Sequence, residues 1–301
     1  MNRLIKWFVS FLLVPAAPAL CLGSCAEGAL DARPSEGHAA IYASWNETGS
    51  LPTSGFRFYF YPQAGGGALV YEATSTGFEG NLPAGSYRVI ACSTDARNAV
   101  YQGMESYSSA AVRATADVSS RAVSYYAQPS GIYVLHVADL TVTAQESTDT
   151  RVVPDTLSRS LNLKFSLLGT DSILSLNGLM RGVLSTVLLS TGTAAAETGV
   201  TSFDAQVSDN EATAQISVLG ILDPQGSLPY RNLMDLNMTL EDASVRTVQV
   251  DMTGFISEVL TANSGTLPAE VPVEVELRLI DTQLVANVKP WQQSSGEGNV
   301  K

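Results

Sequence analysis

The sequence predicts an all-β protein built from two tandem antiparallel β-sandwich domains. Apolar runs of about five to eight residues recur every 8–15 residues or so, and Gly, Pro and Asn separate them. Many runs alternate apolar and polar side chains, which is the pattern of a strand with one face in a core. Residues 253–262 carry the apolar stripe of one short amphipathic helix. These observations favour sandwiches over a doubly wound sheet.

The first domain is expected over residues 38–150. Its clearest strand places Phe56, Phe58 and Phe60 on one face. Turns are predicted at 62–67 and 81–85, where Gly and Pro supply the backbone conformations that turns need. The predicted strands of this domain are 38–45, 55–61, 68–72, 86–92, 109–116 and 132–143.

The second domain is expected over residues 151–291, and the polar composition of 144–158 predicts a connection between the two domains. The strongest strand pattern is 271–279, where five apolar residues alternate with Pro, Glu, Glu and Arg. Segment 174–190 fits either a helix or a pair of buried strands. The other predicted strands are 161–167, 203–207, 212–219, 233–240, 247–252 and 284–288.

The first 24 residues have the features of an export signal. Arg3 and Lys6 precede an apolar stretch that prolines interrupt and that is too short to span a bilayer as a stable helix. The following Leu-Gly-Ser-Cys sequence, 22–25, resembles the lipobox of bacterial lipoproteins. An ordinary signal peptide followed by a chance cysteine is the alternative interpretation.

On the lipoprotein interpretation, Cys25 is the lipid attachment site and the new N-terminus. Several acyl chains there would hold the protein firmly in a membrane, and Ala26 agrees with delivery to the outer membrane. Residues 25–37 would then be a flexible tether. The composition of 292–301 predicts a disordered tail.

Composition narrows the classes of partner. The formal net charge is −12 and basic runs are absent, which disfavours binding to nucleic acid. Once Cys21 is removed and Cys25 acylated, Cys92 alone remains, so a disulfide within the mature chain is excluded. Cys92 stands in an apolar run and is expected to be a small buried hydrophobe.

No pattern predicts an enzyme, a metal site or a cofactor. His38 and His136 are far apart in the sequence; His38 is expected at a solvated strand edge and His136 in a core or an interface. Glu274 and Glu276 share a strand face that is expected to be solvated. The three glycines 65–67 lack a following Lys-Ser/Thr, so they indicate a turn rather than a phosphate site.

Aromatic residues offer a second interpretation, a surface on which sugars stack. Aromatic side chains on antiparallel strands more often form cross-strand pairs, which is the interpretation we favour. The residues concerned are Trp45, Tyr59, Tyr61, Tyr71, Tyr101, Tyr107, Tyr125 and Tyr126.

Three motifs follow the lipobox in a recognisable order. They are 38–45, ending in Trp45; Gly-Phe-Arg-Phe-Tyr-Phe-Tyr-Pro at 55–62, followed by the three glycines; and Asn-Leu-Pro-Ala-Gly-Ser-Tyr at 81–87. Together they resemble the FimB/Mfa2-like, or fimbrillin-like, fimbrial anchor lipoproteins of Bacteroidales. The resemblance covers roughly residues 25–110 and continues more loosely in the second half.

The resemblance implies two transthyretin-like sandwiches in a non-catalytic fimbrial (pilus) subunit of the outer membrane. It further implies assembly with fimbrial stalk subunits by strand-in-groove pairing, with Cys25 as the one functional residue carried over. We expect 271–279 to be an edge strand that takes part in this pairing. The alternative function is a surface glycan-binding lipoprotein of a polysaccharide uptake system; a lipoprotein hydrolase ranks last.

Overall fold

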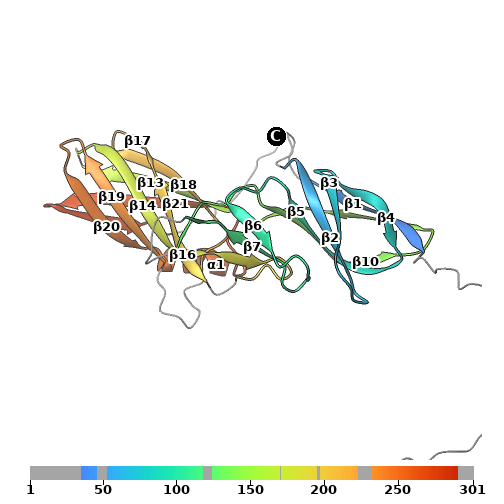
Figure 1. Cartoon of the computed structure of the whole chain (residues 1–301). Coiled ribbons are helices and arrows are strands. Elements are labelled where there is room, and N and C mark those ends of the chain that lie inside the picture. Colours follow the sequence, from blue (N-terminus) through green and yellow to red (C-terminus); the bar gives the residue numbers. More distant parts are fainter. Residues whose placement is uncertain are drawn as a thin grey trace, which may run out of the picture. The chain divides into compact units, whose positions relative to one another are not determined.

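The computed structural model describes residues 35–45, 53–117, 124–169, 171–194, 197–222 and 232–290. All of these residues belong to one compact unit, Ser35–Lys301. The expected signal peptide 1–24, Cys25, most of the tether and the tail 292–301 therefore lie outside the described residues. Within these residues the chain is all-β with one short helix, as the sequence predicts (Figure 1).

The N-terminal sandwich is formed by one sheet that folds over its own core. The strand order is β11-β1-β4-β3-β2-β5-β10-β12. Only one residue pair, Thr74 with Gly77, links β3 to β4, so the sheet is almost interrupted at that point. The bounds are β1 Glu36–Ala43, β2 Gly55–Pro62, β3 Leu69–Thr74, β4 Gly77–Pro83, β5 Gly85–Ser93, β10 Tyr133–Val142, β11 Ser147–Val152 and β12 Asp155–Thr156.

The core of this sandwich is a row of phenylalanine rings. Phe56, Phe58 and Phe60 occupy alternate positions of β2 and are fully buried, as the sequence predicts. Phe78 of β4 meets this row from across the fold, with its ring centroid 4.8 Å from that of Phe60. Strand alternation therefore places large aromatic side chains in one layer, where each buries a large apolar area.

The C-terminal sandwich consists of two sheets that enclose a second core. Their strand orders are β17-β18-β13-β21-β22 and β20-β19-β14-β16-β9-β8. Phe165 and Phe203, one from each sheet, stack with 6.2 Å between ring centroids. The bounds are β8 Ala116–Asp117, β9 Tyr125–Tyr126, β13 Arg159–Leu168, β14 Ile173–Leu184, β16 Thr198–Asp204, β17 Gln206–Ser208, β18 Glu211–Val218, β19 Leu233–Leu240, β20 Val245–Asp251, β21 Glu270–Ile280 and β22 Gln283–Val288.

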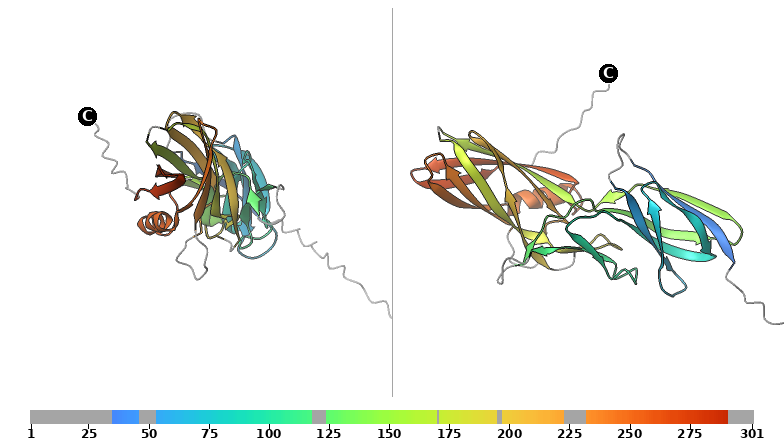
Figure 2. Two further views of the ribbon diagram at one scale, coloured as in Figure 1. Left: turned by 90° about the vertical axis from the view of Figure 1, so that its left-hand side faces the viewer. Right: turned by 45° about the horizontal axis from the view of Figure 1, so that its top comes forward.

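The helix α1, Thr253–Ala262, lies where the sequence predicts it. Phe255, Ile256, Val259 and Leu260 form its buried stripe. Figure 2 shows α1 beside the sheets of the C-terminal sandwich.

The two halves of the chain exchange strands. β8 and β9 come from the first half but extend the six-stranded sheet of the C-terminal sandwich. Conversely, β15 (Thr186–Leu188) joins β7 (Ala111–Ala114) and β6 (Ala99–Gln102) in a three-stranded sheet. The Thr201 hydroxyl donates a hydrogen bond of 2.9 Å to the Tyr126 carbonyl and so fastens β9 to its new sheet.

Some local features differ from expectation. The polar segment 144–158 is not only a connection, because it contains β11 and β12, and residue 150, where the first domain is expected to end, lies in β11. β4 overlaps a predicted turn, since its two glycines and one proline give it a low strand propensity. For segment 174–190, where a helix and a pair of buried strands were both open, the structure has the pair of strands, β14 and β15.

Three ladders are parallel rather than antiparallel. They join β1 to β11, β13 to β21 and β16 to β9. In each case the two strands lie far apart in the sequence, as parallel pairing requires.

Replacement of Phe58 by Ala should remove a large part of the N-terminal core. We expect the free energy of unfolding to fall by about 3–5 kcal/mol, because Phe58 is fully buried and contacts three other phenylalanine rings. Urea titration followed by Trp45 fluorescence measures this, since Trp45 stacks on Phe56. Val100→Ala, at a side chain that is 57% exposed, is the control and should change stability by less than about 0.5 kcal/mol. Equal effects of the two variants would contradict the core assignment.

Candidate functional site

The strand expected at a sheet edge is not there. β21 lies between β13 and β22, and β22 is the edge strand of that sheet. The apolar residues of β21 at 271, 273, 275 and 277 are buried in the protein's own core. β22 pairs only with the second half of β21, from Val275 onward, so Pro272 stands where no amide donor is needed on that side. The expectation that 271–279 is an edge strand was therefore wrong from Val275 onward, where β21 is paired on both sides.

An open edge is found instead between β3 and β4, which we call the β3–β4 seam. β3 is paired along one side with β2, and β4 along one side with β1. Beyond the Thr74–Gly77 pair, the facing edges of β3 and β4 have no partner strand within the described residues. A cavity of about 340 Å³ lies along the seam and is lined by residues 71–74 and 77–81.

Aromatic side chains form the floor of the seam. The Tyr71 and Phe78 ring centroids are 5.2 Å apart, and Tyr71 packs edge-on against Phe60 at 5.7 Å. An unpaired strand edge above an apolar floor is the arrangement that accepts an added strand.

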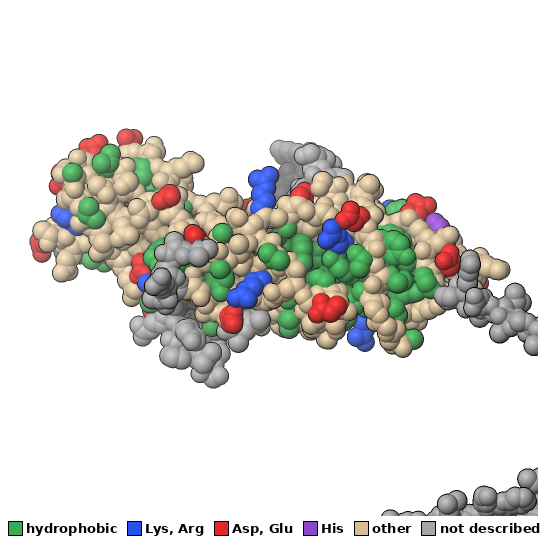
Figure 3. Space-filling view, in the orientation of Figure 1, with side chains coloured by type: hydrophobic (Ala, Val, Ile, Leu, Met, Phe, Trp, Pro, Cys, Tyr) green, Lys and Arg blue, Asp and Glu red, His purple; other side chains and the backbone are tan. Residues whose placement is uncertain are grey.

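Hydrophobic side chains also gather on the surface of the N-terminal sandwich, over the part that Figure 1 labels β2 and β10 (Figure 3).

Most of the aromatic residues singled out in the sequence are used in packing. Trp45 stacks on Phe56 at 5.9 Å, and its indole N–H donates to the Ser75 carbonyl at 2.9 Å. Tyr61 is buried, and its hydroxyl donates to the Met104 carbonyl at 3.0 Å. Tyr126 is also buried. Rings held in this way do not present open faces to a sugar.

His136 does not lie in the core. Its side chain is on an exposed face of β10, where the Tyr107 ring stacks on it with 5.9 Å between centroids. The Arg88 guanidinium lies 5.1 Å from the centroid of the same Tyr107 ring. Partial burial lowers the pKa of His136. The cluster fixes the 103–109 segment to the sheet, and it contains no nucleophile.

His38 lies in the interior strand β1 rather than at an edge. Its Nδ1 is 3.2 Å from the Ser147 hydroxyl, and its Nε2 is 3.6 Å from the Glu79 carboxylate. These residue types match a hydrolase triad. The group lies on an exposed sheet face where β1 is paired with strands on both sides, so backbone N–H groups are not free to hold an oxyanion. The arrangement is that of a surface hydrogen-bond network.

Other predicted residues behave as expected. Cys92 is buried, and burial raises the pKa of its thiol far above the ordinary value. Glu274 is exposed and lies 2.9 Å from the Lys289 ammonium, whose hydrogen bond lowers the pKa of that carboxyl. No group of three or more His, Cys, Asp or Glu in the described ranges could hold a metal ion.

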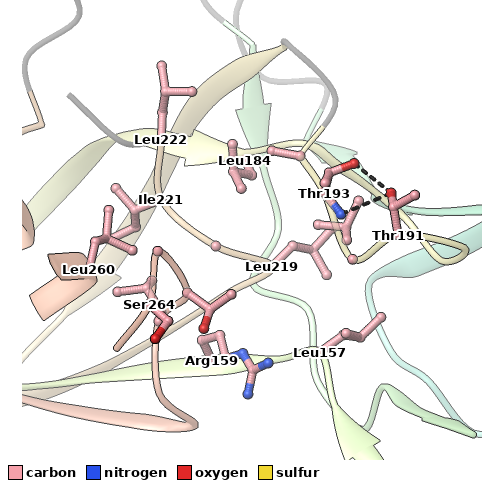
Figure 4. Close-up of a pocket in the computed structure, with 17 residues that line it drawn as sticks. Leu157, Arg159, Leu184, Thr191, Thr193, Leu219, Ile221, Leu222, Leu260 and Ser264 are labelled. Carbon is pink, nitrogen blue, oxygen red and sulfur yellow. Dashed lines mark hydrogen bonds between the residues drawn. The ribbon is translucent and has the colours of Figure 1, made fainter. Parts of the chain in front are cut away.

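A second cavity, of about 440 Å³, lies in the C-terminal sandwich near the end of α1 (Figure 4). Seven of its 17 lining residues are leucine or isoleucine, and Arg159 lies among the others. Sequence reasoning missed this cavity, because its lining comes from five separate segments. No helix in the described part of the chain could span a bilayer.

Comparison with protein families gives one match. Residues 32–204 match the family described as "Domain of unknown function (DUF5119)". No protein of curated function matches the sequence.

Solved structures share the fold over most of the chain. A candidate adhesin from Bacteroides ovatus has 17% identity and a TM-score of 0.60, covering 94% of this chain and all of that one. The fimbrial anchor protein Mfa2 from Porphyromonas gingivalis has 14% identity and a TM-score of 0.56, covering 84% of this chain and 98% of that one. A candidate polysaccharide-binding protein from Bacteroides thetaiotaomicron has 10% identity and a TM-score of 0.55, covering 85% and 98%. These neighbours confirm, for the fold, the resemblance found in the sequence.

The Cys92 thiol should make stability depend on alkaline pH. Because burial raises its pKa in the folded protein, the unfolded chain loses this proton first, above the ordinary value of 9.0. The stabilising contribution is complete below that pH and declines as pH rises. Cys92→Ala should therefore flatten the fall in unfolding free energy between about pH 9 and 11 by up to about 1.4 kcal/mol per pH unit.

Urea titrations across this pH range measure the difference between the two proteins. Burial also raises the pKa values of Tyr61 and Tyr101, and the Cys92 thiolate raises them further, so the difference between the two proteins includes the coupling of these tyrosines to the thiol. Parallel pH profiles would show that the thiol is not held in its protonated form by the fold.

Proposed function

This chain belongs to the DUF5119 family, and we propose that it works as a non-catalytic, lipid-anchored fimbrial subunit at the cell surface. The fold supports this proposal, because its neighbours include Mfa2, described as a fimbrial anchor, and candidate adhesins. Membership of the family does not itself indicate a function. The proposal is therefore argued from the fold together with two features of this chain, the seam and the lipobox.

The single observation that carries the proposal is the β3–β4 seam. A fimbrial joint needs a subunit that can accept an extended segment from its neighbour. At the seam two unpaired edges flank a cavity with Tyr71 and Phe78 in its floor. An incoming strand would gain main-chain hydrogen bonds from an edge and apolar burial from the rings.

Anchoring is assigned to Cys25, outside the described residues. The lipobox and the tether that follows it place the attachment point directly before β1, which begins at Glu36. An acylated N-terminus would fix the subunit in the outer membrane and leave both sandwiches outside the bilayer. In this position it would act as the anchor for fimbrial stalk subunits.

Glycan binding is the second candidate function. The observation in its favour is the neighbour from Bacteroides thetaiotaomicron, which is described as a candidate polysaccharide-binding protein. Against it, Trp45, Tyr61 and Tyr126 are engaged in packing. The fimbrial role is therefore preferred.

Replacement of Cys25 by Ala should abolish lipid attachment. We expect loss of labelled palmitate from the protein and a shift from the membrane to the soluble fraction, because the thiol is the proposed acceptor. Cys21→Ala is the matched control and should leave both measurements unchanged. Incorporation of palmitate by the Cys25→Ala protein would contradict the assignment.

A photo-crosslinking side chain at Tyr71 should capture a neighbouring fimbrial subunit on intact cells. Tyr71 lines the seam, where the incoming strand would lie within reach. The control position is Tyr42 on β1, which is 39% exposed and does not line the seam. Mass spectrometry of the adducts should find a second subunit at position 71 and not at 42. Crosslinks at neither position, or equally at both, would reject the seam as the acceptor.

A further inference from the structure

The cavity of the C-terminal sandwich has the size and lining of a small-ligand site. Its volume is about 440 Å³, which is within the usual range for such sites, roughly 300–1,000 Å³. Five segments of the chain contribute to it: 157–159, the end of β14 with β15, 191–194, 219–222 and 260–267. Apolar side chains dominate the wall, chiefly Leu157, Leu184, Leu219, Ile221, Leu260 and Leu267.

One cation stands at the edge of this apolar wall. The Arg159 side chain is only 17% exposed, and in the described residues its ion pair is with Asp155, at 3.5 Å. The Asp155 side chain is 66% exposed, so solvent weakens this pair. A guanidinium has five N–H donors, and one long ion pair leaves most of them available.

Of the described residues that line the cavity, Arg159 is the one that is charged. Figure 4 shows Arg159 and Ser264 toward one side and Leu184 and Leu222 toward the other, with Leu157 beside Arg159 and with Thr191 and Thr193 on the side of Leu184. A ligand that fits this arrangement has an apolar tail and an anionic head, because the tail removes leucine surface from water while the head meets the guanidinium.

The backbone around the cavity is already paired, which disfavours an added strand. The amide of Leu184 donates to the Gly220 carbonyl, and that of Leu222 to the Gly182 carbonyl, both at 2.9 Å. The Gly265 amide donates to the Leu260 carbonyl at 2.8 Å. A peptide strand would therefore find few main-chain partners here, in contrast to the β3–β4 seam. An aliphatic chain needs no such partners.

We propose that this cavity binds a single-chain anionic amphiphile, with its tail against the leucine wall and its head on Arg159. The head is a carboxylate or a phosphate, which a guanidinium recognises by the same charge-assisted hydrogen bonds. The site is independent of the seam and of the proposed fimbrial role.

Isothermal titration calorimetry tests the proposal with five proteins, a parent and four variants, and with three probes. The full chain with Cys25→Ala is used, so that no acyl chain of its own competes. The probes are decanoate, decyl phosphate and decyltrimethylammonium, which share a ten-carbon tail and differ in the head. We expect one anionic probe per protein, bound at least about tenfold more tightly than the cation.

Arg159→Gln should remove that preference for anions, whereas Arg57→Gln, which breaks a comparable ion pair with Glu72 in the other sandwich, should keep it. Thr193→Trp, at a residue that lines the cavity, should weaken the binding of all three probes. Thr213→Trp on β18 should leave their binding unchanged. The anion that binds more tightly identifies the class of the natural ligand: decanoate indicates a free fatty acid, and decyl phosphate indicates a phosphate headgroup. The proposal fails if neither anion binds, if the cation binds equally well, or if Arg159→Gln leaves the preference intact.

Discussion

Pairing between strands that are distant in the sequence is the constraint on which this structure depends. β1 at the start of the described chain is held by β11, more than a hundred residues later, and β13 is held by β21 over a similar distance. Each pairing satisfies backbone groups that would otherwise be buried without partners. The same requirement explains why β8 and β9 join the far sheet. The edge strand of a sandwich sheet is paired by a segment that lies close enough to form a ladder with it, even when that segment comes from the other half of the chain.

This constraint also determines where the protein can bind something. Where a distant strand completes the ladder, as β13 does along one side of β21, that side offers no free edge. Between β3 and β4 no distant strand completes the ladder, so unpaired strand edges remain beside the Tyr71 and Phe78 rings. The cavity near α1 differs from both of these sheet edges. The backbone groups around it are already hydrogen-bonded, and its lining is largely apolar. The two binding surfaces that we propose therefore differ in kind, one suited to a strand and the other to an aliphatic chain.

Local pattern predicted much of the fold. The alternation at Phe56, Phe58 and Phe60 predicted a buried face, and all three are fully buried. The stripe in 253–262 predicted α1 with the correct ends. By contrast, β4 and β11 were missed. β4 contains Gly and Pro, and β11 is polar at most positions, so neither has an apolar alternation of its own. They are strands because a neighbour pairs with them.

The sequence by itself determined the class of the fold, the face that each strong strand buries and the burial of Cys92, because these follow from side-chain periodicity and hydrophobicity along a few neighbouring residues. It also supplied the only account of Cys25, through the residues beside it. The tertiary structure decided that β21 is interior, that the seam is open, and that Arg159 borders a cavity. Those features depend on which distant segments meet, and the pattern within one strand carries no information about its partner.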